Sequence, residues 1–427
     1  MLHGVAHGGE AVGRAGDVVA FVGYALPGER ARVRVTERKP RYVRGRLIAL
    51  LEEAPERVPP PCPIFAICGG CHWQHADYSA QLRFKSDVLR DQLVRVGKFP
   101  RPSLEPALPS PQAWHYRNTV QLVPRSGAPA ERRERRLCFQ RAHSHDPVPV
   151  EHCYISDPLI NRAIAAVPWG ALTPATWDGL SAVEARVVPQ RAVQLILAGD
   201  IVPTRGEVMR LVDGARSRLP EISGVLFARR RGGDPYPLWG EDALTYEIGG
   251  ERLEVPAGAF MQVNLGAAEL LVKRVLDWLG PTATDTVLDV YAGVGTFTVP
   301  LARRAATVIG VESHALTVQA LSRNARHAGC TNVRLQPGAA EVVLPRLERA
   351  VDLAVLDPPR RGCAPEVLDA VVRLAPRRIA YVSCEPATLA RDLRHLTEAG
   401  YALARSGVVD LFPHTYHLES VSLLERA

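Results

Sequence analysis

Cys384 is the residue whose position best suits covalent chemistry, in the segment "IAYVSCEPATLARDL" (379–393). Apolar and small residues before it predict a buried strand, and the Glu-Pro pair after it predicts a helix, because proline fits the first helical turn. The positive end of that helix would favour a thiolate. Such a cysteine can fill a core, bind a metal or act as a nucleophile, and we interpret it as a nucleophile. Cys330 and Cys363 lack this setting and are predicted to be structural.

A second group of cysteines lies in the segment "CPIFAICGGCHWQH", where Cys62, Cys68 and Cys71 have the spacing C-x5-C-x2-C. Three thiolates this close in sequence can bind a soft metal centre, and the Gly-Gly pair lets the backbone fold tightly around it. A fourth ligand is needed; Cys153 is the candidate and Cys138 the competitor. The spacing leaves zinc and an iron–sulfur cluster both open. It is not the C-x3-C-x2-C of radical enzymes that use S-adenosylmethionine.

The C-terminal part of the chain alternates short apolar strands with helices, which predicts a doubly wound, mainly parallel sheet. The strands lie in "TVLDVYAGVGTFTVPLA" (286–302), "TVIGVE", "VRLQ", "LAVLDPPRRG" and "IAYVSC". Ligands of such sheets bind beyond the carboxyl ends of the strands. Gly293 and Gly295 would let a nucleoside approach the backbone, and Glu312, at the end of the second strand, suits its ribose hydroxyls. Asp357 would face the same crevice.

Two ligands compete for this crevice, a nicotinamide dinucleotide and S-adenosylmethionine. The dinucleotide fingerprint G-x-G-x-x-G wants a small third residue, but Thr298 stands there. It also wants room for a pyrophosphate where Thr296 and Phe297 lie. S-adenosylmethionine has no phosphate, and the form D-x-Y-x-G-x-G suits its amino-acid end, so we favour it.

A thiolate beside a methyl donor suits methylation of a pyrimidine at carbon 5. Addition of the thiolate to carbon 6 makes carbon 5 nucleophilic, and a base must then remove the proton on carbon 5. Glu419, at the start of a predicted final strand in "FPHTYHLESVSLLER", is the candidate base.

The N-terminal region predicts a small β-barrel with a cationic face. In "ERARVRVTERKPRYVRGR" (29–46), Arg30, Arg32 and Arg34 alternate with small apolar residues, as in a strand with one basic face. The proline-rich "EEAPERVPPPC" ends this unit, so we divide the chain into a barrel (1–55), an α+β central domain (56–255) and the cofactor domain (256–427). We also expect an exposed basic loop at 125–136.

The overall charge and length narrow the class of protein. The 427 residues carry a net charge of +7 with a pI of about 9.1, which favours an anionic partner such as nucleic acid. We find neither a run of apolar residues long enough to span a bilayer nor a signal peptide, so we expect a cytoplasmic protein without membrane contact.

The chain resembles the RNA uracil-C5 methyltransferase family almost end to end, specifically the iron–sulfur branch that includes 23S rRNA 5-methyluridine methyltransferases. "ALPGERARVRV" is similar to part of a TRAM domain, a small RNA-binding barrel, and "CPIFAICGGCHWQH" with "SHDPVPVEHC" is similar to the cluster motif. "GAFMQVN", "YVSCEPATLARDL" and "FPHTYHLESVSLL" are similar to the cofactor, nucleophile and base motifs. Where relatives often carry a polar residue after the third strand, this chain has "QPGAAE".

The resemblance implies a class I S-adenosylmethionine-dependent methyltransferase domain, and it implies roles for individual residues. Cys384 would be the catalytic thiol and Glu419 the proton acceptor. The set Cys62, Cys68, Cys71 and Cys153 would hold a 4Fe–4S cluster. The cofactor contacts would be Gln262, Tyr291, Thr296, Glu312 and Asp357, beside Gly293 and Gly295.

We therefore expect an enzyme that methylates carbon 5 of a uridine in structured RNA, with ribosomal RNA favoured over transfer RNA. We expect no obligate protein partner, and we interpret the cluster as structural or RNA-positioning, because methyl transfer needs no electron. Two other classes are a non-catalytic RNA-binding protein, which the intact Cys384 and Glu419 oppose, and a dinucleotide oxidoreductase, which Thr298 opposes.

Overall fold

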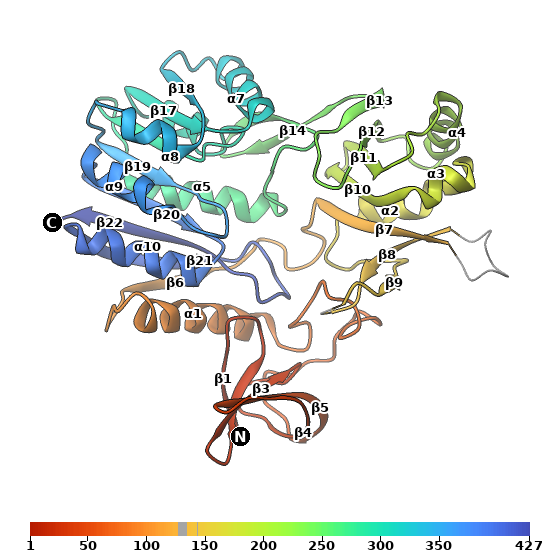
Figure 1. The fold of residues 1–427 in the computed structure, drawn as a ribbon, viewed down its shortest axis with the longest axis horizontal. Coiled ribbons are helices and arrows are strands. Elements are labelled where there is room, and N and C mark those ends of the chain that lie inside the picture. Colours follow the sequence, from red (N-terminus) through yellow and green to blue (C-terminus); the bar gives the residue numbers. More distant parts are fainter. Residues whose placement is uncertain (127–134, 143) are drawn as a thin grey trace.

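The computed structural model of the chain describes residues 1–126, 135–142 and 144–427. The chain begins with a five-stranded barrel-like unit (Figure 1), whose strands follow the order β1-β2-β3-β5-β4. Their bounds are β1 Leu2–Val5, β2 Ala11–Ala15, β3 Val18–Gly23, β4 Arg30–Arg38 and β5 Tyr42–Glu52. No helix in the described part of the chain is long and apolar enough to cross a membrane.

The basic strand predicted near residue 30 is β4. Arg30, Arg32 and Arg34 are exposed, whereas Val33 is half-buried against the small barrel core. The alternation does not reach Val35, which is 47% exposed, because the register with β5 shifts between Val35 and Glu37. The cationic face of the barrel is therefore present, and it ends at an irregular edge.

A long connection leads from the barrel through the cysteine segment into α1 (Tyr78–Arg95) and β6 (Leu104–Leu108). The side chain of Asp77 caps α1 by accepting a hydrogen bond from the amide of Ala80. Leu89 and Leu93 of α1 are fully buried in the core of the C-terminal sheet. Helix α1 lies early in the sequence, yet it packs on the C-terminal domain.

The central region is α+β, as the sequence predicted, and is built on a seven-stranded sheet of order β13-β12-β11-β10-β7-β8-β9. Its helices cover a core that includes Trp177, Leu211 and Phe227. The expected basic loop at 125–136 falls largely on 127–134, outside the described residues, and its flanks belong to β7 and β8. The elements are β7 Thr119–Ser126, β8 Arg135–Gln140, β9 Pro147–Pro149, α2 Pro158–Ala166, η1 Trp169–Ala171, α3 Pro174–Asp178, β10 Leu180–Val188, β11 Ala192–Gly199, α4 Arg205–Arg216, β12 Ile222–Ala228 and β13 Tyr236–Gly240.

A two-stranded hairpin, β14 (Ala243–Ile248) and β15 (Glu251–Pro256), links the central region to the C-terminal domain. Helix α5 (Leu265–Leu279) follows and ends at Gly280, whose left-handed φ of 62° suits glycine. The side chain of Asn264 caps its start by accepting from the amide of Ala267.

The C-terminal domain holds an eight-stranded sheet of order β18-β17-β16-β19-β20-β22-β21-β6. Strands β16 to β20 are parallel, and β22 is antiparallel to both β20 and β21. The predicted fold class, a doubly wound methyltransferase sheet after a small barrel and an α+β region, is confirmed. The elements are β16 Thr286–Val290, α6 Thr298–Ala302, β17 Thr307–Glu312, α7 Ala315–His327, β18 Val333–Pro337, α8 Ala340–Val343, η2 Leu344–Arg346, β19 Leu353–Leu356, α9 Pro365–Leu374, β20 Arg378–Ser383, α10 Pro386–Glu398, β21 Tyr401–Val409 and β22 Glu419–Arg426.

The edge strand of this sheet comes from far earlier in the chain. Strand β6 pairs parallel with β21, with Leu104 opposite Ser406, and α1 packs on α10, β6 and β21. In Figure 1 both elements lie beside the last strands, between the barrel and the sheet. The predicted boundaries at 55 and 255 stay predictions, and this pairing joins part of 56–255 to the sheet of 256–427.

Candidate active site and cysteine site

The register of the last strands places Cys384 beside Glu419. In the antiparallel pair β20–β22, Ser383 lies opposite Ser420. One step beyond that pair the chain continues to Cys384 on one side and Glu419 on the other. Pro386 opens α10 directly after the cysteine, as predicted. Neighbouring strands lie about 5 Å apart, and the carboxyl of Glu419 is close enough to act on the pKa of the Cys384 thiol.

Burial governs the protonation of this pair. Glu419 is 3% exposed, and its pKa is raised well above the ordinary value by burial and by the carboxyl of Asp357. Burial, then Glu419 and Asp357, raise the pKa of the half-buried Cys384 to about 11. Burial and the two carboxyls thus oppose the thiolate expected from the sequence, which stays a prediction.

Arg360 carries the opposite charge at this site. Its exposed guanidinium lowers the pKa of both Cys384 and Glu419, against the effect of burial. The backbone carbonyl of Arg360 accepts a hydrogen bond from Thr388 on α10, at 3.0 Å, which ties the loop after β19 to the helix after Cys384. Arg360 was missed as a site residue, although it directly follows the two prolines of the "LDPPRRG" motif.

A network of buried hydrogen bonds fixes the loop that follows β19. The Oδ2 atom of Asp392 accepts from the amide of Cys363 at 2.8 Å and from the hydroxyl of Tyr381 at 2.6 Å. Cys363 is 4% exposed, and its pKa is raised to about 12, mainly by burial. The prediction that Cys363 is structural agrees with this position.

The end of β17 faces the cofactor crevice through Glu312. Its Oε2 accepts from the amide of Gly293 at 3.0 Å, and its Oε1 accepts from the amides of Ser313 and His314, both at 2.7 Å. These donors hold the carboxylate in place while its remaining lone pairs stay free to accept from hydroxyl groups. Glu312 and Tyr291 line a cavity of about 280 Å³, together with residues 338–341 and Pro359.

The two glycines of the turn after β16 differ. Gly293 has φ 56°, and nothing lies within 4 Å of the place where a Cβ would stand, so a ligand can approach it. At Gly295, with φ 103°, a Cβ would lie 2.6 Å from Leu321, so this glycine is needed for packing of α7. Tyr291 has a left-handed φ of 68°, unusual for a residue with a side chain.

Two further predicted contacts lie close to this turn. Thr296 is half-buried just before α6, and the next threonine, Thr298, donates to Oδ2 of Asp289 at 2.5 Å. Burial raises the pKa of Asp289 to about 7. Burial likewise raises the pKa of Asp357 to about 7.

Gln262 approaches from outside the sheet. It lies in the connection between β15 and α5 and is 6% exposed, and its carbonyl accepts from the side chain of Asn118 at 3.0 Å. Gln262 and Asp357 lie outside the lining of the cavity beside Tyr291. The structure therefore brings Tyr291, Gly293 and Glu312 together, and the roles of Gln262, Thr296 and Asp357 as cofactor contacts stay predictions.

The predicted cysteine set lines one cavity. Cys62, Cys68, Cys71 and Cys153 face a space of about 380 Å³, and none of the eight cysteines, all within the described residues, forms a disulfide. Burial raises the pKa of Cys71 to about 12, with smaller contributions from the other three thiols. Over the described ranges, no three His, Cys, Asp or Glu side chains are close enough to hold a single metal ion.

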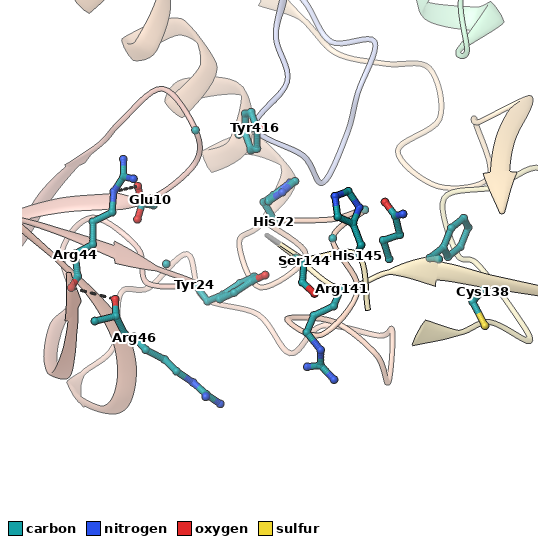
Figure 2. Close-up of a pocket in the computed structure, with 18 of the residues that line it drawn as sticks. Glu10, Tyr24, Arg44, Arg46, His72, Cys138, Arg141, Ser144, His145 and Tyr416 are labelled. Carbon is teal, nitrogen blue, oxygen red and sulfur yellow. Dashed lines mark hydrogen bonds and ion pairs between the residues drawn. The ribbon is translucent and has the colours of Figure 1, made fainter. Parts of the chain in front are cut away.

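The competitor for the fourth ligand lies elsewhere. Cys138 is 2% exposed in β8 and lines a different space, a cleft of about 950 Å³ between the barrel and the central region. Figure 2 shows Tyr24, Arg44 and Arg46 of the barrel on one side of this cleft, with Arg141 and His145 across from them. Gly69 and Gly70 line both the cleft and the cysteine cavity, so the cysteine segment forms a wall between them.

Comparison with known proteins adds relatives to this geometry. Residues 248–427 match the family model described as tRNA (uracil-5-)-methyltransferase, and residues 2–48 match the TRAM domain. The chain is 36% identical to an uncharacterized RNA methyltransferase of Thermosynechococcus vestitus, covering 99% of this chain and 96% of that protein. It is also 36% identical to the 23S rRNA (uracil(1939)-C(5))-methyltransferase RlmD of Edwardsiella ictaluri, covering 98% and 93%.

One solved structure resembles the whole chain. The tRNA (uracil-54, C5)-methyltransferase of Pyrococcus abyssi, in complex with S-adenosyl-L-homocysteine, superposes with a TM-score of 0.76. It is 23% identical in sequence, and the match covers 99% of both chains. This likeness concerns the fold.

Proposed function

Since the chain belongs to the RNA uracil-C5 methyltransferase family, we propose that it methylates a uridine of 23S ribosomal RNA through a covalent adduct between Cys384 and the base. The chain is an S-adenosylmethionine-dependent RNA methyltransferase. The placement of Cys384 beside Glu419 supports the mechanism, and the 36% identical relative named for 23S rRNA supports the substrate.

Cys384 begins the reaction. Its sulfur adds to carbon 6 of a uracil that has left its stack, because attack at that carbon comes from the face of the ring. The thiol must lose its proton to react, and its pKa of about 11 makes this costly in the free enzyme. The guanidinium of Arg360 favours the thiolate and the negative charge that passes into the ring.

Glu419 completes the reaction. After methylation, carbon 5 carries both the new methyl group and its original proton. The carboxylate of Glu419 takes that proton, and the bond between Cys384 and carbon 6 then breaks, which restores the double bond and frees the thiolate. Burial raises the pKa of Glu419, so its carboxylate, when ionised, binds a proton more strongly than that of an exposed glutamate.

The cofactor contacts are assigned to the turn and strand ends of the sheet. S-adenosylmethionine supplies the methyl group as a sulfonium. Glu312 would accept from its ribose hydroxyls, which fits a carboxylate already held by three amides. The remaining proposed contacts are Gln262, Tyr291, Gly293, Gly295, Thr296 and Asp357.

We also propose that Cys62, Cys68, Cys71 and Cys153 hold a 4Fe–4S cluster. The four thiols line one cavity, and the likeness of their motif to that of the iron–sulfur branch favours this cluster over zinc. The cluster would tie the cysteine segment to residues near Cys153.

The variant Cys153→Ser should lose bound iron and sulfide, whereas Cys138→Ser, at the competing position for the fourth ligand, should keep them. The opposite result would reassign the fourth ligand.

The cleft of Figure 2 suits RNA. It carries Arg44, Arg46, Arg141 and Arg231, which can contact phosphates, and Tyr24 and Tyr416, which can stack on bases. Tyr416, in the segment between β21 and β22 that precedes Glu419, lines this cleft, so RNA bound there would lie near the proposed catalytic pair.

A trapping experiment tests the mechanism. A 23S rRNA fragment with 5-fluorouridine, incubated with S-adenosylmethionine, should form an adduct that survives denaturation, since fluorine cannot be removed as a proton is. The adduct should map to the peptide that contains Cys384, and Cys384→Ala should form none. An adduct on another cysteine, or none with the wild-type enzyme, would overturn the proposal.

Transfer RNA is the second candidate substrate, because the family model that matches residues 248–427 is named for it. Matched transcripts of transfer RNA and of the 23S rRNA fragment, methylated in parallel with labelled cofactor, distinguish the two. Faster labelling of transfer RNA would make it the substrate and leave the mechanism unchanged.

A further inference from the structure

The segment 410–418 connects β21 to β22 and directly precedes Glu419, and we call it the base loop. Most of its anchoring contacts come from outside the C-terminal domain's own strands and helices. The hydroxyl of Tyr116 donates to the carbonyl of Pro413 at 3.0 Å, and the ring of Trp114 stacks on that of His414, with 3.6 Å between the ring centroids. The position of the proposed base therefore depends on elements that stand far from it in sequence.

The cysteine segment holds the middle of the base loop. The amides of His72 and Trp73, which directly follow Cys71, both donate to the carbonyl of His414, at 2.8 and 3.0 Å. Thr415 and His417 of the base loop line the same cavity as the four cysteines. The wall of the cysteine cavity is thus also a support of the base loop.

Gln81 joins these two segments with one side chain. It is fully buried on α1, and its Oε1 accepts from the amide of His414 at 2.7 Å. Its Nε2 donates to the carbonyls of Trp73 and Ala76, at 3.1 and 2.9 Å, and lies 3.1 Å from Nδ1 of His414. A buried amide with every group engaged fixes the segments it joins, because each lost hydrogen bond would leave a buried polar group unpaired.

Lys85, one turn further along α1, anchors the start of the base loop. Its Nζ donates to Oδ1 of Asp410 at 2.6 Å and to the carbonyl of Phe412 at 2.9 Å, and both charged side chains are fully buried. The face of α1 that carries Gln81 and Lys85 therefore holds the base loop at two points, while the strand pairing of β22 holds its end at Glu419.

We propose that Gln81 is a positioning residue for Glu419: it fixes the base loop against α1 and the cysteine segment, and so aims the carboxylate at carbon 5 of the target base. This inference rests on the proposed role of Glu419. Gln81 touches no reacting atom. Its effect should fall on the step that uses the base, proton removal after methyl transfer, and not on the earlier attack by Cys384.

A substitution at Gln81 should separate these steps. Gln81→Met keeps the length and volume of the side chain but loses all its hydrogen bonds. We expect trapping by 5-fluorouridine RNA at the wild-type rate, because trapping needs Cys384 and the cofactor but no base. Turnover on ordinary RNA should fall about 10- to 100-fold, because a small misplacement of a catalytic group costs that much. The unreleased adduct should then accumulate on ordinary RNA.

Two further variants support the comparison. Gln81→Glu keeps the acceptor for the amide of His414 but buries a carboxyl oxygen against the carbonyls of Trp73 and Ala76, so its defect should be at least as large as that of Gln81→Met. Gln92→Met is the matched control, because Gln92 stands on the same helix and, among the described residues, its side chain donates to the neighbouring Asp91, at 3.3 Å. It should leave turnover and trapping unchanged.

The outcomes are distinct. Wild-type turnover by Gln81→Met, without accumulated adduct, would overturn the inference. So would an equal loss of trapping and turnover with a lower melting temperature, since that is the pattern of a merely structural residue. If the wild-type enzyme itself forms no 5-fluorouridine adduct, the proposed function falls and this inference falls with it, whereas successful wild-type trapping isolates the test of Gln81.

Discussion

Two aspartates near the ends of one strand, β16, carry their charge in opposite ways. Asp285, at the amino edge of the sheet, accepts two hydrogen bonds from the guanidinium of Arg377, at 2.8 and 2.9 Å. That contact lowers its pKa to about 2. Asp289 lies near the carboxyl edge. Its Oδ2 accepts a hydrogen bond from Thr298, and no described residue forms a hydrogen bond with its Oδ1. Burial raises its pKa to about 7.

The same contrast holds on β22. Because β22 runs antiparallel to the central strands, its last residues lie at the amino edge of the sheet and its first residue lies at the carboxyl edge. Glu425, at the amino edge, accepts from Arg378 at 2.9 Å, whereas Glu419, at the carboxyl edge, has its pKa raised by burial. Asp285 and Glu425 at the amino edge each pair with an arginine, whereas burial raises the pKa of Asp289 and Glu419 at the edge where ligands bind. Glu312 is the exception at that edge, because three amides hold its carboxylate. Acidic residues of one sheet thus divide into those that stabilise the fold and those poised for chemistry.

The largest effect should come from Glu419→Gln. The amide cannot accept the proton from carbon 5, so turnover should fall about 10³-fold, the usual contribution of a general base. Adduct with ordinary RNA should accumulate, as a band of enzyme and labelled RNA in a denaturing gel.

Glu425→Gln is the matched control on the same strand. It removes a half-exposed partner of Arg378 and should leave turnover unchanged. An equal loss of turnover in both variants would break the distinction between the two edges.

A smaller effect is expected from Arg360→Gln. Loss of the guanidinium should raise the pKa of Cys384 further. At any pH below that pKa, a higher pKa means a smaller fraction of thiolate. Alkylation of Cys384 by iodoacetamide, followed by peptide mass spectrometry, should rise with pH toward about 11 in the wild type. The variant should follow a parallel curve displaced to higher pH and should react about 3- to 10-fold more slowly at neutral pH.

Arg394→Gln provides the comparison for that experiment, because Arg394 pairs with Glu398 on the exposed face of α10. Its alkylation curve should coincide with that of the wild type. A curve for Arg360→Gln that also coincides would mean that the guanidinium does not act on the thiol.

The smallest effect, and one on stability alone, should come from Asp285→Asn. The carboxylate is 4% exposed and has a depressed pKa, so it stabilises the fold above its unfolded pKa. At neutral pH the variant should lose about 2 kcal/mol of unfolding free energy in urea, the scale of hydrogen bonds to a charged group. That difference should shrink as pH falls from about 4 through 2, where the wild-type carboxylate is itself protonated. Turnover of the folded variant should not change.

The sequence predicted the parts of the fold that repeat a local pattern. The strand before Cys384 and the helix opened by Pro386 follow from apolar periodicity and proline chemistry, and the strands that end at Glu312 and Ser383 lie where expected. The pairing of β6 with β21 could not be predicted, because no local pattern tells a short edge strand which distant strand it will join.

The candidate site was predicted in part for the same reason. Motifs indicated Cys384, Glu419 and the cysteine set, because each stands in a distinctive run of residues. The raised pKa of Cys384 could not be foreseen, since it depends on burial and on carboxyls that only the folded chain brings close. The motif around Glu419 covers much of the base loop, but the role of Gln81 carries no sequence signal, because its contacts join segments far apart in the chain.

The edge strand β6 has a consequence for how the protein is made. Helix α1 and strand β6 emerge early from the ribosome, whereas β21, whose Ser406 lies opposite Leu104 of β6, is among the last segments to emerge. Pairing of strands so distant in sequence is slow, and the waiting surface can associate with other chains. Until synthesis ends, Leu89 and Leu93 of α1 have no core to enter. We therefore expect this apolar surface to be covered during synthesis, by the growing central region or by a chaperone.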